Sequence, residues 1–343
     1  MKPLDDLDPP SFEFGRGRRR RDLEEAAADE AGDFEPARFS DDDDLEIPFF
    51  DSPPAGPEIR VSAGGAGEKP PLWRRLPFAR GETAQRVLVA LPWIALAIFI
   101  VAVGGDVFMV AMIAFAVLGL REFFRMAAGS IPVMLPAYAA VAGMVIAAHY
   151  GSAFQILLVL ACSFPAIFAF AAARKSHEGV TVSMAVTMLG IAWMGLGFSH
   201  AMLLRDLPDH GGALLIDVLV ATFVGDTAAY GAGRLFGSRK ITPRISPNKT
   251  LEGLIGGFIG GTLGFWFAGL YQDWLPGIDA LLMGMVIAAV APIGDLFASM
   301  IKRDLEVKDT GTLFGPHGGL IDRLDAVIFT VVAGYYLAVA FVY

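Results

Sequence analysis

A succession of apolar stretches, each about 20 residues long, limits the folds that are open to this chain. Nine of them follow one another: 87–105, 107–126, 131–150, 153–173, 180–204, 212–233, 251–271, 278–301 and 324–343. A stretch of this length spans a bilayer as a helix, because an α-helix rises about 1.5 Å per residue. The mean hydropathy of +0.54 supports the same interpretation. We therefore predict an all-α polytopic membrane protein with about nine transmembrane helices.

The first 70 residues differ in composition from the rest of the chain. They contain 19 acidic and 9 basic side chains, many Pro and Gly residues, and no apolar periodicity. A segment of this kind cannot bury enough apolar surface to fold, so we expect a disordered acidic tail over residues 1–70. An apolar core near Met1 is missing, which argues against a signal peptide. Residues 71–86 form a basic juxtamembrane segment, and residues 87–343 form the expected transmembrane domain.

The distribution of basic residues predicts the orientation of the helices. Loops on the same side as the N-terminus hold 13 Lys and Arg residues, whereas loops on the opposite side hold only Arg205. Lys and Arg concentrate in cytoplasmic loops. We therefore expect a cytoplasmic N-terminus, an outside C-terminus and a multi-pass protein of the plasma (inner) membrane. The single cysteine, Cys162, excludes a disulfide framework and a metal site built from cysteines.

A first polar region covers residues 225–253. Asp226, Tyr230 and Arg234 are spaced four apart, so they share one face of a helix. The following loop combines Ser, Thr, Asn, Lys and Arg with glycines and prolines, a mixture that suits a cradle for phosphates. Taken alone, this region is equally well explained as a basic loop on the cytoplasmic face.

A second polar region covers residues 294–325. Asp295, Ser299 and Lys302 lie on one helical face, and Asp295 lies inside an apolar stretch, where it should not face lipid. Asp322 and Asp325 also share a face, at the start of the last stretch. Carboxylates are the ligands that Mg²⁺ prefers, and the neighbouring cations suit a nucleotide or phosphate substrate.

Transporters and structural membrane proteins also carry charged residues inside the membrane. A transporter buries carboxylates, but it predicts charge near the bilayer midplane and inverted repeats. Here the polar groups lie at the expected cytoplasmic ends, and the sequence contains no evident internal repeat. A purely structural role leaves the density of charge and glycine over residues 295–325 without a cause. The pattern therefore favours an enzyme over both alternatives.

The second region resembles the signature of a known enzyme family. Ser299-x-Ile301-Lys302-Arg303, then Lys308-Asp309, Gly311 and Phe314-Gly315-x-His317-Gly318-Gly319-Leu320, followed by Asp322-Arg323-Leu324-Asp325, is similar to the signature of the phosphatidate cytidylyltransferases. Residues 226–253 resemble that family's second motif. The order Gly315-Pro316 departs from the commoner Pro-Gly and changes the turn before the histidine. The resemblance covers roughly residues 85–343 and is specific over 225–325.

The resemblance implies transfer of CMP from CTP to phosphatidate, giving CDP-diacylglycerol and pyrophosphate. It implies a membrane-embedded homodimer with Mg²⁺ as cofactor and a second, monovalent cation such as K⁺. The distribution of basic residues predicts that the active site faces the cytoplasm, and we expect no nucleic-acid partner. Carried over by position, the metal ligands are Asp295 and Asp322. Further ligands or orienting residues are Asp325, Asp226 and Asp309.

The chemistry of this reaction assigns roles to the remaining polar residues. The second pKa of a phosphomonoester is about 6, so the attacking lipid phosphate is largely ionised and needs no general base. The task is to bring two polyanions together, which cations do by neutralising charge. We expect phosphate contacts from Lys249, Lys302, Arg303, Lys308 and Arg323, and a hydrogen bond from His317. The expected CTP-binding residues are Ser246, Asn248, Lys249, Thr250, Gly318 and Gly319.

One rival function shares the same general architecture. A CTP-dependent lipid kinase of the dolichol or phytol kinase type would transfer the γ-phosphoryl group instead, but the signature favours nucleotidyl transfer. Two further carboxylates are expected to have no direct role in the chemistry. Glu122, beside Arg121, is expected to form an ion pair at the membrane interface. Asp217 is expected to be paired or to face a cavity.

Overall fold

Two glycines lie where the first described helix ends and the next begins. The computed structural model describes residues 95–311 and 318–343, and its first helix covers residues 95–103. Gly104 and Gly105 then adopt φ angles of 65° and 53°, a conformation that glycine reaches without strain. The chain therefore turns between two apolar stretches and starts α3 at Gly105.

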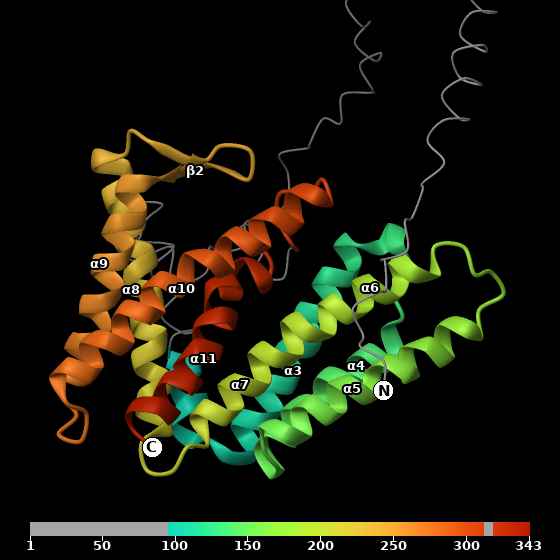
Figure 1. Ribbon diagram of the computed structural model, residues 1–343, viewed down its shortest axis with the longest axis horizontal. Coiled ribbons are helices and arrows are strands. Elements are labelled where there is room, and N and C mark those ends of the chain that lie inside the picture. The colour runs from blue at the N-terminus through green and yellow to red at the C-terminus, as the bar shows by residue number, and fades with distance from the viewer. Residues whose placement is uncertain (1–94, 312–317) are drawn as a thin grey trace, which may run out of the picture. The chain divides into compact units, whose positions relative to one another are not determined.

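Helices make up nearly all of the regular structure in the described residues (Figure 1). A 3₁₀ turn at Ala128–Ser130 follows α3. The helices and the turn of π-helix between α6 and α7 are α3 Gly105–Met126, α4 Met134–Tyr150, α5 Ala153–Ala172, α6 Val180–Gly190, η4 Ile191–Gly195, α7 Leu196–Arg205, α8 Gly211–Phe236, α9 Leu251–Gly269, α10 Gly277–Asp304 and α11 Ile321–Phe341. A small antiparallel hairpin, β1 Lys240–Thr242 and β2 Ser246–Thr250, lies at one end of α8 and α9 (Figure 1).

Seven helical segments in the described residues are long and apolar enough to cross a membrane. They are α3, α5, the continuous path from α6 to α7, α8, α9, α10 and α11. These segments confirm the prediction of an all-α polytopic membrane protein. The predicted stretch 131–150 appears as α4, an apolar helix of 17 residues, and the stretch 87–105 is described only from residue 95. The total of nine spans and the sides on which the termini lie stay predictions, and the tail and juxtamembrane segment lie outside the described residues.

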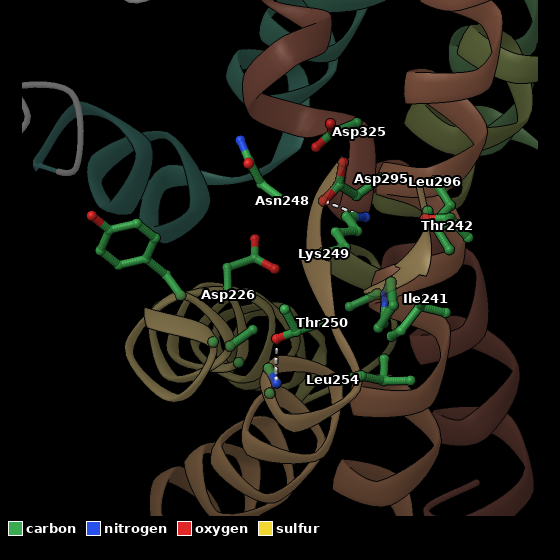
Figure 2. A pocket seen from close by; sticks show the side chains of 18 of the residues that line it. Asp226, Ile241, Thr242, Asn248, Lys249, Thr250, Leu254, Asp295, Leu296 and Asp325 are labelled. Carbon is green, nitrogen blue, oxygen red and sulfur yellow. Dashed lines mark hydrogen bonds and ion pairs between the residues drawn. The ribbon is translucent and has the colours of Figure 1, made fainter. Parts of the chain in front are cut away.

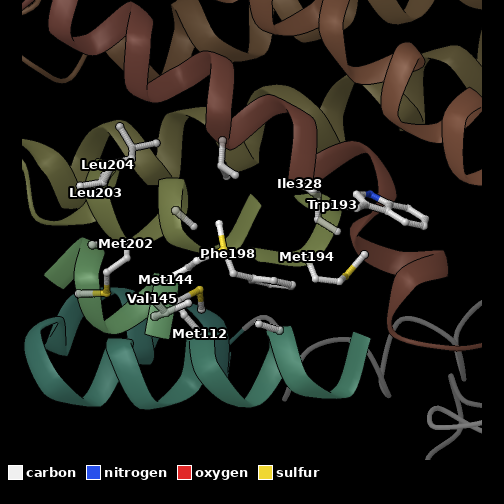
Figure 3. Packing of buried hydrophobic residues seen from close by; sticks show 14 of the residues in the cluster. Met112, Met144, Val145, Trp193, Met194, Phe198, Met202, Leu203, Leu204 and Ile328 are labelled. Carbon is white, nitrogen blue, oxygen red and sulfur yellow. The ribbon is translucent and has the colours of Figure 1, made fainter. Parts of the chain in front are cut away.

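The core between α3, α4, α7 and α11 is filled by flexible and aromatic side chains. Met144, Met194 and Met202 are fully buried there, and Figure 3 shows them interleaved with Phe198. Methionine adapts to irregular gaps between helices. The π-helical turn places Trp193 edge-on against Phe123 of α3, at a ring-centroid distance of 5.8 Å. This packing holds α3 against the middle of the α6–α7 path.

Glycines allow α8 and α9 to approach closely along their length. A Cβ atom added at Gly257 would lie only 2.9 Å from Cβ of Ala229, and one added at Gly260 would collide with Cβ of Ala228. Small residues at helix contacts in membranes permit this backbone proximity. The contact fixes α8 beside α9, and α10 and α11 pack next to them in sequence order.

Candidate active site

A cavity of about 780 Å³ lies among α8, the β1–β2 hairpin, α9, α10 and α11. Its volume is within the range of about 300–1,000 Å³ that small-molecule sites occupy. Four carboxylates from three helices line it: Asp226 of α8, Asp295 of α10, and Asp322 and Asp325 of α11. Figure 2 shows the side chains of Asp226, Asp295 and Asp325 directed toward the same space as Asn248 of the hairpin. The two polar regions of the sequence therefore meet in one cavity.

The α8 wall follows the predicted helical spacing. Asp226, Tyr230 and Arg234 all line the cavity, and Nη1 of Arg234 donates to the Tyr230 hydroxyl at 3.1 Å. Residues four apart lie on one helix face, so the sequence pattern was sufficient to predict this shared orientation. The guanidinium lies near the hairpin end of α8, where it adds positive charge to the cavity.

The first ion pair joins the hairpin to α10. Nζ of Lys249 lies 2.7 Å from Oδ2 of Asp295, and the Ser299 hydroxyl donates to Oδ1 at 3.3 Å. The Asp295 side chain is 37% exposed, whereas Nζ of Lys249 is itself buried. A ligand can therefore reach the carboxylate, while the buried ammonium needs either this carboxylate or a substrate anion as its partner.

The second ion pair joins α10 to α11 and is more enclosed. Nζ of Lys302 lies 2.8 Å from Oδ1 of Asp322, with side-chain exposures of 13% and 12%. Oδ2 of Asp322 accepts three further hydrogen bonds, from the Thr310 amide at 2.9 Å, the Thr310 hydroxyl at 3.0 Å and the Gly319 amide at 3.0 Å. Gly318 has φ of +84°, a backbone conformation that residues other than glycine rarely adopt. Asp322 therefore ties α10 to residues on both sides of positions 312–317.

Asp226 and Asp325 have no ion-pair partner among residues 95–311 and 318–343. Asp325 accepts a hydrogen bond from the Ala326 amide at 2.9 Å. Carboxylates that face one cavity repel each other, and a bound cation relieves that repulsion. In the described part of the chain, no three Asp, Glu, His or Cys side chains converge on one point. The oxygen donors still fit Mg²⁺, which keeps several of its waters and is held by only one or two carboxylates in most sites.

The structure brings many of the predicted site residues to this cavity. Those that line it are Asp226, Asn248, Lys249, Thr250, Asp295, Lys302, Asp322 and Asp325. The Thr250 hydroxyl is already used, because it accepts from the Gly253 amide and caps α9. The predicted CTP contact by Thr250 therefore competes with a helix cap.

Other predicted residues lie outside the cavity lining. They are Ser246, Arg303, Lys308, Asp309, Gly318, Gly319 and Arg323. Arg303 donates from Nε to the Ile245 carbonyl at 3.3 Å, which links α10 to the hairpin turn. Lys308 and Asp309 are exposed after the end of α10. His317 lies outside the described residues.

The expectation for Glu122 was wrong. Its side chain is buried, at 6% exposure, and it forms no ion pair within the described residues, where Arg121 is exposed. Glu122 instead accepts hydrogen bonds from the Leu320 and Ile321 amides at 2.9 and 3.0 Å. These partners lie almost 200 positions away in the chain, so local sequence could not identify them. The expectation for Asp217 is confirmed, because both its oxygens accept from Gln272 Nε2, at 2.9 and 2.8 Å.

Comparison with known proteins assigns the chain to a family. The model of the cytidylyltransferase family matches residues 84–341. The uncharacterized protein YnbB of Escherichia coli is 44% identical over 142 residues, which cover 40% of this chain and 48% of YnbB. The phosphatidate cytidylyltransferase of Bacillus subtilis is 34% identical over 154 residues, covering 45% of this chain and 57% of that enzyme. These two matches span about half the length of each relative.

A further match extends over most of the chain. The phosphatidate cytidylyltransferase of Staphylococcus haemolyticus is 30% identical over 254 residues, which cover 72% of this chain and 95% of that enzyme. The family model covers the described helices, including those that carry the four cavity aspartates. This chain therefore belongs to the cytidylyltransferase family.

Proposed function

We propose that this protein transfers CMP from CTP to phosphatidate, forming CDP-diacylglycerol and releasing pyrophosphate. The observation that carries the proposal is the single cavity in which four aspartates meet Arg234, Lys249 and Lys302. Polyanionic substrates need such cations, and a hard metal ion needs such carboxylates. Relatives named phosphatidate cytidylyltransferase support the choice of CTP and phosphatidate among phosphate-containing substrates.

In this reaction an oxygen of the lipid phosphate forms a bond to the α-phosphorus of CTP. The bond between that phosphorus and the oxygen bridging to the β-phosphate breaks, and pyrophosphate leaves with the electron pair. Lys249 and Lys302 would turn from their carboxylates toward phosphate oxygens, neutralise negative charge and hold the reacting groups in line. Arg234 would contribute a further contact from α8.

The carboxylates would hold the metal. Asp295, Asp322 and Asp325 are the proposed ligands, Asp226 of α8 lines the same cavity, and Mg²⁺ would neutralise charge on the phosphates. Asp295 and Asp322 each attract a lysine ammonium in this structure, so both positions favour a cation. We also propose a second, monovalent cation such as K⁺, because four aspartates line the cavity.

The position of the cavity fits a lipid substrate. All four helices that border it are long and apolar enough to span a membrane, so the acyl chains of phosphatidate can stay in the bilayer. The surplus of Lys and Arg in the loops on this side supports a cavity open to the cytoplasm, where CTP is available. We propose a homodimer in the plasma (inner) membrane, on the resemblance to the family alone.

The test uses purified full-length protein in detergent with CTP, phosphatidate and Mg²⁺. CDP-diacylglycerol and pyrophosphate should appear in equal amounts, and a chelator should stop both until Mg²⁺ is restored. Asp279→Asn, at the far end of α10 from the cavity, is the control variant and should retain activity. Absence of both products from the wild-type protein would refute the proposal.

A further inference from the structure

Glu122 of α3 is a buried carboxylate in contact with the segment that carries Asp322. Its Oε1 accepts from the Leu320 amide at 2.9 Å, and its Oε2 accepts from the Ile321 amide at 3.0 Å. The Thr310 hydroxyl lies within hydrogen-bond distance of the same Oε2, at 3.2 Å. These groups belong to the two chain segments that flank positions 312–317.

Glu122 and Asp322 divide the amides at the start of α11 between them. The Gly319 amide donates to Asp322, while the next two amides, of Leu320 and Ile321, donate to Glu122. Amides at a helix N-terminus have no partner inside the helix, and they attract negative charge. Glu122 therefore takes the place of an N-terminal cap that the local sequence does not supply, since the side chain of Leu320 cannot accept a hydrogen bond.

We propose that Glu122 is a positioning residue for the proposed nucleotidyl transfer, holding Thr310 and the start of α11 so that Asp322 and Asp325 face the cavity. The inference rests on the proposed function. Glu122 itself does not line the cavity, so it acts through the residues that it holds.

The connection from Glu122 to the cavity is short and runs through Thr310. The single proton of the Thr310 hydroxyl is shared between Oδ2 of Asp322, at 3.0 Å, and Oε2 of Glu122, at 3.2 Å, and Asp322 in turn holds Lys302 at 2.8 Å. Thr310 is 4% exposed, so water does not compete readily for its hydroxyl. Three successive contacts therefore lead from α3 to a cation that lines the cavity.

The surroundings leave little room for Glu122 to move. A Cβ atom at Gly311 would lie 2.9 Å from Oε1 of Glu122, and one at Gly319 would lie 2.8 Å from its carboxyl carbon. Next to Glu122 on α3, Phe123 packs edge-on against Trp193 at 5.8 Å. Because Gly311 and Gly319 have no side chains, they leave space for the Glu122 carboxylate. The aromatic contact of Phe123 holds that part of α3 in position.

The experiment compares Glu122→Gln, Glu122→Asp and Thr310→Val in full-length protein, with Arg121→Gln as the matched control on the same helix. Glutamine keeps the volume but loses the charge and one acceptor. Loss of an orienting partner of this kind typically costs about 10- to 100-fold in activity or metal affinity. We expect Glu122→Gln to lower kcat by about that factor and to raise the Mg²⁺ concentration needed, with KM for CTP little changed.

Two comparisons separate positioning from general stability. Because Glu122 and Thr310 act on one carboxylate, the double variant Glu122→Gln/Thr310→Val should lose less than the product of the two single losses. Glu122→Asp, which keeps the charge, should recover part of kcat. A lower thermal midpoint with normal kcat and normal Mg²⁺ dependence would show a structural role only and would overturn the proposal.

Hydrogen exchange supplies a measurement that does not depend on activity. The amides of Leu320 and Ile321, which donate to Glu122, should exchange faster in Glu122→Gln than in the wild type, and their exchange should be unchanged in Arg121→Gln. If the wild-type protein forms no CDP-diacylglycerol, the proposed function fails, whereas unchanged exchange at these amides refutes the role of Glu122 itself. Faster exchange together with the loss of kcat in an active enzyme supports both.

Discussion

Lys302, near the end of α10, is joined to Asp322, in the first turn of α11, by an ion pair of 2.8 Å. Both side chains are nearly enclosed, and both line the cavity. The two residues lie 20 positions apart in the chain, and their ion pair links α10 to α11, which are in contact. A group proposed to neutralise substrate phosphates is therefore also a structural link.

Replacing Lys302 with methionine should impair both stability and turnover. The substitution leaves Oδ1 of Asp322 without its cation. Removing one partner of a buried ion pair lowers the free energy of unfolding by about 3 kcal/mol. We expect a lower thermal midpoint in detergent and loss of CMP transfer. Lys240→Met, an exposed position on β1, is the control and should change neither. A Lys302→Met protein with normal stability would show that the pair is not a structural link.

Asp295→Asn should separate chemistry from folding. Asparagine keeps the volume of Asp295 and an oxygen that can still accept from Nζ of Lys249, so this substitution should lower the thermal midpoint less than Lys302→Met does. Turnover should fall by about 100-fold or more, since removing one electrostatic contact at a reacting centre has effects of that order. Turnover and thermal unfolding are measured on the same preparation. Near-normal turnover would remove Asp295 from the proposed metal ligands.

The glycine contact between α8 and α9 predicts opposite effects for two Gly→Ala substitutions. A methyl group at Gly260 would collide with Ala228, so Gly260→Ala should force the helices apart and destabilise the cavity wall. Gly231 on α8 has nothing within 4 Å of an added Cβ, so Gly231→Ala should be neutral or stabilise by about 0.5–1 kcal/mol. Thermal midpoints of the two variants test the difference. Equal effects would contradict the close contact.

The proposed orientation can be tested with single cysteines. Cys162 is the sole native cysteine, so Cys162→Ala provides a background without thiols. A cysteine at Ser238, next to the hairpin, should react with a membrane-impermeant thiol reagent only after the cells are opened. A cysteine at Asp209, between α7 and α8, should react in intact cells. The reverse pattern would place the cavity on the outer face.

The sequence predicted most of the helices and the two polar regions that line the cavity, because both follow from local patterns. Apolar length indicated the membrane segments, and the four-residue spacing from Asp226 to Arg234 indicated the face that turned out to line the cavity. The role of Glu122 could not be predicted, because its partners are backbone amides, which no sequence pattern marks. The cap formed by Thr250 could have been predicted, since threonine before a glycine-rich helix is a typical N-cap.

The proposed reaction requires that the α-phosphoryl part of CTP, with its nucleoside, reaches the lipid. An assay of purified protein with phosphatidate, Mg²⁺ and CTP labelled in parallel at the α- or the γ-phosphorus measures this directly, with polyprenol as an additional acceptor. We predict label in the lipid fraction from the α position alone, with Asp295→Asn inactive and Asp279→Asn active. Label in a lipid from the γ position alone would contradict cytidylyl transfer and identify a lipid kinase.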